Sequence, residues 1–195
     1  MGHRIDGILL VNKIKGETSH DVVKKVKAAF GLKNCKVGHA GTLDPFATGL
    51  LIILLGQGTK LSRFIMSEDK VYRGTMRLGV ETDTLDCTGS VVHKVTVSEL
   101  GIEQIREKAR QFVGEIEQLP PVYSAVKYKG TRAYKLARRG EEMSLKKRNV
   151  TVYSLRILSV DLPDVTMEVR CSSGTYIRSL AADPVSYTHL TLPTN

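Results

Sequence analysis

Short strand-like and helix-like segments follow one another along this chain without the regular strand–helix–strand repeat of a parallel α/β protein. Buried or half-buried strands are predicted at 7–12, 50–55, 70–78, 150–160 and 165–171, the last two as an antiparallel hairpin across the turn at 161–164. Further strands are predicted at 89–97 and 123–128, a loop over 38–49, and a strand-to-helix turn over 56–60. Helices are predicted over about 20–30, 60–66, 102–113 and 132–139, and from about 175 onward. Thr18 and Ser19 offer an N-cap for the first of these helices, and a capping box at 96–99 precedes the third. This order of elements predicts an α+β fold with a mixed, mostly antiparallel sheet flanked by helices.

The length of 195 residues fits one domain, or one domain with a lobe inserted into it. The net charge is +9, and the excess is concentrated: residues 127–148 hold nine basic and two acidic side chains, a local charge of +7. Such a basic stretch attracts polyanions through phosphate contacts and counterion release. The alternative is a solvated face that only improves solubility.

The three cysteines, Cys35, Cys87 and Cys171, are far apart and form no CxxC pair, which argues against a zinc site or a disulfide framework. The N-terminus shows no apolar signal region, and the aliphatic run at 50–55 is too short to span a bilayer. We therefore expect no metal, no membrane and a cytoplasmic location.

The segment 36–51, KVGHAGTLDPFATGLL, places one carboxylate, Asp44, in a loop directly before an apolar strand. The glycines permit tight backbone paths and close ligand approach. Pro45 fixes its own φ and biases Asp44 toward an extended conformation. A carboxylate held in this way is pre-positioned for chemistry. A structural Asp-Pro turn is the alternative reading of the pair alone.

This segment resembles the loop of TruB-type pseudouridine synthases, Gly-x-Leu-Asp-Pro-x-Ala-Thr-Gly. The resemblance extends over about residues 4–183. It includes the segments Asn12-Lys13, Thr18-Ser19-His20-Asp21, Lys70-Val71-Tyr72-Arg73, Leu78 to Thr84, Pro120 to Ala125, and Cys171 to Arg178. It implies the pseudouridine synthase fold. The lead-in Gly38-His39-Ala40-Gly41 is more similar to the bacterial stand-alone type than to the guide-RNA-dependent relatives.

The resemblance implies isomerisation of uridine to pseudouridine in the T-loop of tRNA, at the uridine conventionally numbered 55, with no cofactor and no metal. Asp44 matches the family nucleophile. Attack on the base or sugar and action on the 2′ proton both remain open, since each needs an ionised carboxylate close to the nucleoside. We expect the T-arm of tRNA as partner and a monomeric protein.

Further site residues follow from the same resemblance. Arg178 matches the arginine that pairs with the aspartate, and Tyr72 the tyrosine that stacks on the flipped base. His39 matches the histidine that inserts into the T-loop, and Lys13 a lysine that supports the active-site loop, although Ile14 stands where the family commonly has proline. The remaining RNA-binding candidates are Lys60, Tyr123, Lys127, Arg132 and Tyr134.

The family pattern stops at about Asp183. We therefore predict an incomplete catalytic domain over 1–183, a non-family and artefactual tail over 184–195, and no PUA domain. Weak or absent activity is expected for the chain as written. Two alternatives stay open: a non-catalytic tRNA-binding or tRNA-folding module, for which the basic stretch would suffice, and a guide-RNA-dependent pseudouridine synthase. A glycosidase dyad of Asp44 with Asp83 or Asp86 is disfavoured, because the surrounding pattern is unlike a hydrolase.

Overall fold

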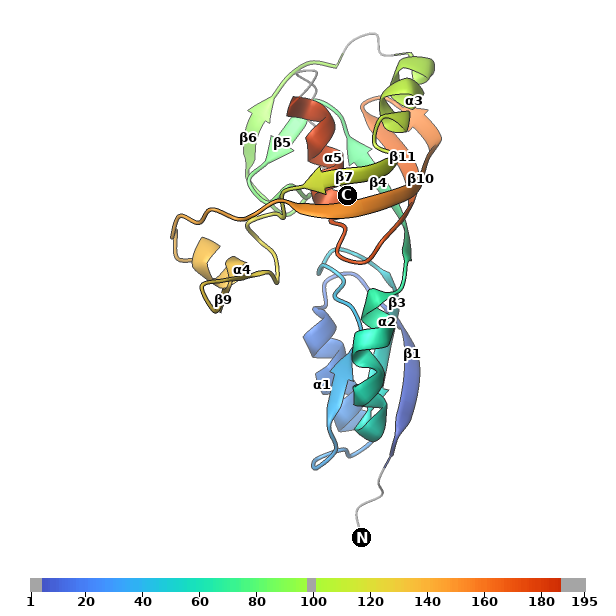
Figure 1. Ribbon diagram of the computed structural model, residues 1–195, viewed down its shortest axis with the longest axis vertical. Coiled ribbons are helices and arrows are strands. Elements are labelled where there is room, and N and C mark those ends of the chain that lie inside the picture. Colours follow the sequence, from blue (N-terminus) through green and yellow to red (C-terminus); the bar gives the residue numbers. More distant parts are fainter. Residues whose placement is uncertain (1–4, 98–100, 187–195) are drawn as a thin grey trace. The chain divides into compact units, whose positions relative to one another are not determined.

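The computed structural model describes residues 5–97 and 101–186, and the chain divides into two compact units, residues 1–68 and 69–195 (Figure 1). Every strand pair among the described residues is antiparallel. The predicted α+β class is confirmed. No helix in the described ranges is long and apolar enough to cross a membrane. The predicted tail falls largely on residues 187–195, which lie outside the described residues.

The first unit is a three-stranded sheet in the order β1–β3–β2, with helix α1 packed on one face (Figure 1). Its elements are β1 (Gly7–Lys13), α1 (Ser19–Ala29), β2 (Val37–His39) and β3 (Gly49–Leu55). Leu51, Ile53 and Leu55 point from β3 into a core that they share with Val22 and Val26 of α1. Burial of this apolar surface is the main force that holds helix and sheet together.

Helix α1 begins where the sequence predicted, because Thr18 and Asp21 form a capping box. The Thr18 hydroxyl accepts a hydrogen bond from the backbone N–H of Asp21 at 3.1 Å, and the Asp21 carboxylate accepts one from the backbone N–H of Thr18 at 3.2 Å. The Thr18 hydroxyl also donates to the Asp21 carboxylate at 2.5 Å, and this bond, together with the one from the Thr18 N–H, lowers the pKa of Asp21 to about 2.

The predicted helix at 60–66 is a 3₁₀ turn, η1 (Gly56–Leu61), followed by α2 (Ser62–Ser67). A Cβ on Gly58 would lie 2.3 Å from the carbonyl oxygen of Gly7, so η1 packs tightly against the start of β1. The sequence 56–60 is a strand-to-helix turn, as predicted.

The second unit is built on a four-stranded sheet in the order β4–β11–β10–β7. Its strands are β4 (Lys70–Arg77), β7 (Gly114–Gln118), β10 (Arg148–Asp161) and β11 (Asp164–Cys171). Helices α3 (Ile102–Arg110) and α5 (Ile177–Ser186) contribute Ile105 and Leu180 to its core. The predicted hairpin across 161–164 is confirmed as the β10–β11 pair.

Two small hairpins complete the second unit. One pairs β5 (Val80–Thr82) with β6 (Val91–Lys94). The other, β8 (Lys127–Tyr128) with β9 (Thr131–Arg132), leads into α4 (Ala133–Ala137). We call residues 127–139 the basic lobe.

Two local predictions were wrong. The predicted loop 38–49 begins with β2, because Val37–His39 pairs with Ile53–Leu55 in spite of Gly38. The strand expected over 123–128 is limited to Lys127–Tyr128, since the carbonyls of Tyr123 and Ser124 accept hydrogen bonds from Arg178 and Tyr134 and not from a neighbouring strand.

The capping box expected at 96–99 falls partly on residues 98–100, which lie outside the described residues. Helix α3 begins after Gly101, whose N–H donates a hydrogen bond to the side-chain oxygen of Gln104.

Candidate active site

Asp44 lies at the centre of the loop that joins β2 to β3, and its side chain is half-buried. The loop turns at Gly41 and Gly49, with φ of +111° and +119°, a region that residues with a Cβ rarely adopt. The Asp44 carbonyl accepts a hydrogen bond from the N–H of Ala47 at 3.0 Å. The glycines read from the sequence therefore have the backbone role expected of them.

The Asp44 loop is tied to the first turn of α1. The hydroxyl of Ser19, which is 3% exposed, accepts a bond from Leu43 N–H at 3.0 Å and lies 3.2 Å from the Leu43 carbonyl oxygen. Leu43 also packs against the first unit's core. The residue before Asp44 is thus fixed by both polar and apolar contacts. Apart from its place next to an N-cap, nothing in the sequence signals this role of Ser19.

Lys13 is 1% exposed, and its ammonium donates to the carbonyls of Ile14, Glu17 and Pro45 at 3.0, 2.8 and 3.3 Å. Burial lowers the pKa of Lys13, while the charges of Glu17 and Asp44 oppose that shift. Because Pro45 O also accepts from Gly16 N–H at 2.8 Å, Lys13 and Gly16 together hold the residue after Asp44. This position agrees with the loop-supporting role expected for Lys13.

Lys13→Met tests that role. Methionine keeps the apolar stem but leaves three carbonyls short of a donor, and one buried unsatisfied polar group costs ~1–3 kcal/mol. We expect amide protection in β1 and β3 to fall about 10- to 100-fold, read by hydrogen exchange. Lys15→Met, at an exposed position of the same segment, is the control and should leave protection unchanged. Equal protection in both variants would contradict the role.

His39 and Lys60 differ in their relation to the Asp44 loop. His39 ends β2 at the start of the loop and bonds the Gly41 carbonyl through Nδ1. Lys60 is exposed on η1, beyond the far end of β3 from Asp44. Seven strand residues span ~20 Å. The structure therefore brings His39 and Lys13 to the Asp44 loop and separates Lys60 from it.

Arg178, at the start of α5, is 5% exposed and surrounded by acceptors within the second unit. Its Nη1 donates to Thr84 O at 3.1 Å and lies 3.4 Å from Asp86 Oδ2, and its Nη2 donates to Tyr123 O at 3.1 Å. A guanidinium held from several directions is fixed in orientation. Tyr123, predicted as an RNA contact, thus also holds Arg178 through its backbone.

Asp86 is a residue whose role sequence reasoning missed, because it was weighed only as part of a hydrolase dyad. It is 5% exposed, and its Oδ1 accepts bonds from the Thr84 hydroxyl, Thr88 N–H and Thr88 hydroxyl at 2.9, 2.9 and 2.6 Å. Leu85 between them adopts φ of 58°, which is uncommon for a non-glycine residue. The short spacing Thr-Asp-Thr-Leu-Asp is the signal that could have indicated a structured turn.

The start of α5 is held by a second unpredicted residue, Gln118. This side chain is 1% exposed and forms two bonds with the Tyr176 backbone, donating to its carbonyl at 2.9 Å and accepting from its N–H at 2.7 Å. Ser179 adds a bond to Leu119 O at 2.8 Å. Together these contacts fix the position from which Arg178 projects.

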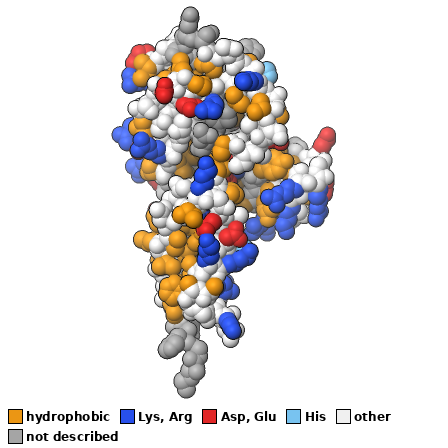
Figure 2. Space-filling model, turned by 180° about the vertical axis from the view of Figure 1, so that it is seen from behind, with side chains coloured by type: hydrophobic (Ala, Val, Ile, Leu, Met, Phe, Trp, Pro, Cys, Tyr) orange, Lys and Arg blue, Asp and Glu red, His pale blue; other side chains and the backbone are white. Residues whose placement is uncertain are grey.

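Tyr72 lies on β4 opposite Val169 and packs, half-buried, against the second unit's core. Lys127, Arg132 and Tyr134 all lie in the basic lobe, where Arg138 stacks over the Tyr134 ring at 5.7 Å and Lys129 over Tyr128 at 5.4 Å. Figure 2 shows Lys and Arg side chains gathered on this lobe. The sequence-predicted concentration of positive charge is therefore a surface feature.

An open groove of about 740 Å³ lies between the basic lobe and the Asp83 turn. Tyr123, Val122 and Ala137 line it together with Asp83 and residues 140–144. No group of three His, Cys, Asp or Glu side chains in the described ranges could hold a metal ion. The predicted site residues thus fall into two sets. The first unit holds Lys13, His39, Asp44 and Lys60, and the second holds Tyr72, Tyr123, Lys127, Arg132, Tyr134 and Arg178.

This fold is that of the pseudouridine synthases. A solved structure described as a Cbf5–Nop10–Gar1 complex matches 97% of this chain and 46% of its own, with 28% identity and a TM-score of 0.73. The model of the TruB family pseudouridylate synthase N-terminal domain matches residues 27–177, and the chain belongs to this family.

Curated proteins named tRNA pseudouridine synthase B are similar to this chain. A tRNA pseudouridine synthase B of Clostridium kluyveri is 51% identical over 92% of this chain and 61% of its own length. That of Syntrophotalea carbinolica is 45% identical over 92% of this chain and 58% of its own length. The chain thus spans about three fifths of the length of these relatives.

Proposed function

We propose that this chain carries the uridine-isomerising site of a tRNA pseudouridine synthase that acts on the T-loop, at the uridine conventionally numbered 55. The observation that supports it most is the Asp44 loop, which is held on both sides of the aspartate by buried Ser19 and Lys13. A carboxylate fixed in this way needs no reorganisation to reach a bound nucleoside. The relatives named tRNA pseudouridine synthase B support tRNA as the substrate.

In this proposal Asp44 is the nucleophile and Arg178 pairs with it. An adjacent guanidinium favours the ionised carboxylate, which both chemical routes require. The acceptors around Arg178 fix the orientation of its guanidinium. Isomerisation then detaches the uracil from C1′, rotates it and rejoins it through C5, so the atoms balance without cofactor or metal.

Tyr72 is proposed as the stacking partner of the target base. A uridine in a folded loop must leave its stack before its glycosidic bond can be reached, and an aromatic face stabilises the extruded base. His39 is proposed to enter the T-loop beside it. Three free cysteines, Cys35, Cys87 and Cys171, agree with the reducing cytoplasm, where tRNA is found.

The basic lobe is proposed to bind phosphates of the T-arm. Replacing Lys127 and Arg132 by Ala should weaken RNA binding and flatten its salt dependence, because each lost phosphate contact reduces the slope of log K against log salt by ~0.7–0.9. Filter binding of a T-arm hairpin over a salt series measures both. The control replaces Lys94 and Lys108, which are exposed on β6 and α3, and should leave the slope unchanged. Identical slopes for the two variants would contradict the assignment.

Tritium release tests the function itself. T-arm RNA labelled at uridine C5 loses tritium when the base rejoins through C5. The assay uses residues 1–183 joined to the remaining sequence of the Clostridium kluyveri relative, because the matched region spans three fifths of that protein. Salt-sensitive binding without release would favour the alternative of a non-catalytic tRNA-binding module, which the charge of the basic lobe supports. Release that required a guide RNA would favour the guide-dependent alternative.

A further inference from the structure

Gln118, the last residue of β7, holds the residue that precedes helix α5. Its side-chain amide donates to the Tyr176 carbonyl at 2.9 Å and accepts from the Tyr176 N–H at 2.7 Å, so one side chain binds both backbone groups of one residue. The Tyr176 carbonyl also accepts from the Leu180 N–H at 2.9 Å, a bond of the first helical turn. Gln118 therefore fixes the point at which α5 begins.

The residue after Gln118 adds a contact further along the same helical turn. The Leu119 carbonyl accepts from the hydroxyl of Ser179, which is 3% exposed, at 2.8 Å. Gln118 and Leu119 are consecutive, and the two residues that they hold, Tyr176 and Ser179, lie on either side of Arg178 in the chain. The end of β7 thus sets the backbone of the turn that carries Arg178.

The first turn of α5 needs such support because its own charge is unfavourable there. Arg178 is the second residue of the helix, and this turn contains no acidic side chain. The N-terminus of a helix carries a partial positive charge, so a cation in the first turn opposes helix formation. Gly174, with φ of +83°, lies just before the helix and leaves the chain free to take other paths. An external partner for Tyr176 removes that freedom.

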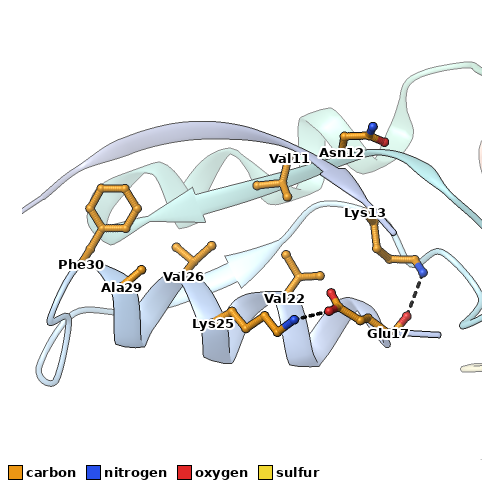
Figure 3. Close-up of a pocket in the computed structure, with 9 residues that line it drawn as sticks. All are labelled: Val11, Asn12, Lys13, Glu17, Val22, Lys25, Val26, Ala29 and Phe30. Carbon is orange, nitrogen blue, oxygen red and sulfur yellow. Dashed lines mark hydrogen bonds and ion pairs between the residues drawn. The ribbon is translucent and has the colours of Figure 1, made fainter. Parts of the chain in front are cut away.

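Asp44 is supported by a similar device within the first unit. Figure 3 shows the Lys13 side chain directed at the backbone carbonyl of Glu17, one of the carbonyls that it binds. In each unit, a polar side chain that is 1% exposed holds the backbone near one of the two charged residues assigned to the reaction. Lys13 also brings a positive charge near Asp44, whereas Gln118 is neutral. Gln118 therefore acts on Arg178 through geometry alone.

We propose that Gln118 is a positioning residue for uridine isomerisation, an inference that rests on the proposed function. By holding Tyr176 it fixes the place from which the Arg178 guanidinium acts, and the rate of the chemical step depends on that place. Gln118 is too deeply buried to contact RNA itself. A misplacement of ~1 Å at a reacting centre can lower the rate ~100-fold. Substitution of Gln118 should therefore lower kcat and leave the KM for T-arm RNA unchanged.

Gln118→Glu separates this role from a general structural one, because its hydrogen bonding depends on pH. A protonated carboxyl can donate to the Tyr176 carbonyl and accept from the Tyr176 N–H, as the amide does. An ionised carboxylate can only accept, and it repels the carbonyl oxygen. Burial and the bond to the carbonyl both favour the protonated form, so they raise the pKa of the introduced carboxyl. The two bonds should be present below that pKa and lost as the pH rises through it.

Tritium release is measured on the fusion of residues 1–183 to the Clostridium kluyveri sequence, between about pH 5.5 and pH 8.5, a range that covers a strongly raised carboxyl pKa. Relative to the unsubstituted fusion, kcat of Gln118→Glu should be ~10- to 100-fold lower at the upper end and within about threefold at the lower end. Gln118→Met, which offers Tyr176 neither donor nor acceptor, should be equally low at both ends. Gln111→Glu makes the acidic change at an exposed position after α3 and should match the unsubstituted fusion at every pH.

A kcat deficit of Gln118→Glu that is the same at both ends overturns the proposal, and so does a deficit of Gln118→Met that disappears at low pH. A change in KM alone overturns it as well. Tyrosine fluorescence of the 195-residue chain reports folding at each pH. If Gln118→Glu unfolds at high pH, Gln118→Met decides, and a kcat within about threefold of the unsubstituted fusion overturns the proposal.

The same assay distinguishes failure of this inference from failure of the isomerase assignment. An unsubstituted fusion that releases no tritium at any pH rejects the assignment and the role of Gln118 with it. An active fusion in which Gln118→Glu follows Gln111→Glu at every pH rejects the role of Gln118 alone.

Discussion

Asp44→Asn should reduce tritium release from T-arm RNA by at least ~10³-fold, the scale expected when a catalytic nucleophile is removed. Asparagine has nearly the same shape as aspartate but no negative charge, so it cannot serve either chemical route open to Asp44. The loop contacts of its neighbours do not involve the Asp44 carboxylate: Ser19 binds the Leu43 backbone, and Lys13 binds the Pro45 carbonyl. The variant should therefore fold and bind RNA.

The control for this prediction is Asp21→Asn, which removes a carboxylate from a partly exposed position of the same unit while leaving the N-cap Thr18 and a side-chain oxygen that can accept from the Thr18 N–H. Tritium release and RNA binding are measured on the same preparations. A loss of release with retained binding then shows that the variant is folded and that the chemical step is impaired. Turnover by Asp44→Asn at a rate close to that of Asp21→Asn would remove Asp44 from the mechanism. Loss of both release and binding would point to a structural role for the loop.

The fold was readable from the sequence wherever one local pattern was strong. The alternation at 165–171 and the turn at 161–164 predicted the β10–β11 hairpin, and Thr18 predicted the start of α1. The strand β2 was missed because its three residues include Gly38, so only pairing with β3 stabilises it. Pairing between distant segments is a tertiary effect that local propensity does not contain.

In the candidate site, too, the features marked by a local pattern could be predicted and those that depend on distant partners could not. The Asp44 loop could be found because glycines and Pro45 mark its backbone in sequence. Ser19, Gln118 and Asp86 could not be assigned, because their partners are backbone atoms or side chains 24, 58 and 92 residues away. Ordinary polar residues become important only when folding buries them against such partners. Burial also explains why Lys13 supports a loop although its sequence neighbourhood departs from the family pattern.

Asp86→Ala should destabilise the second unit by about 3–5 kcal/mol, because it removes a buried carboxylate that lies 3.4 Å from the buried Arg178 guanidinium. The carbonyls of Thr84 and Tyr123 still accept from Arg178 in this variant, but a carbonyl does not replace the negative charge of Asp86. All seven tyrosines lie at or beyond Tyr72, and the chain has no tryptophan, so tyrosine fluorescence in a urea titration reports on the second unit alone.

The matched control for this last prediction is Asp83→Ala in the same turn. Asp83 is exposed and accepts one bond, from Ser90 N–H at 2.8 Å, so its removal should cost less than ~1 kcal/mol. The double variant Asp86→Ala with Arg178→Met should recover part of the lost stability, since an apolar pair needs no charge partner and buried ion pairs are often replaceable in this way. If Asp86→Ala and Asp83→Ala unfold at the same urea concentration, Asp86 does not stabilise Arg178.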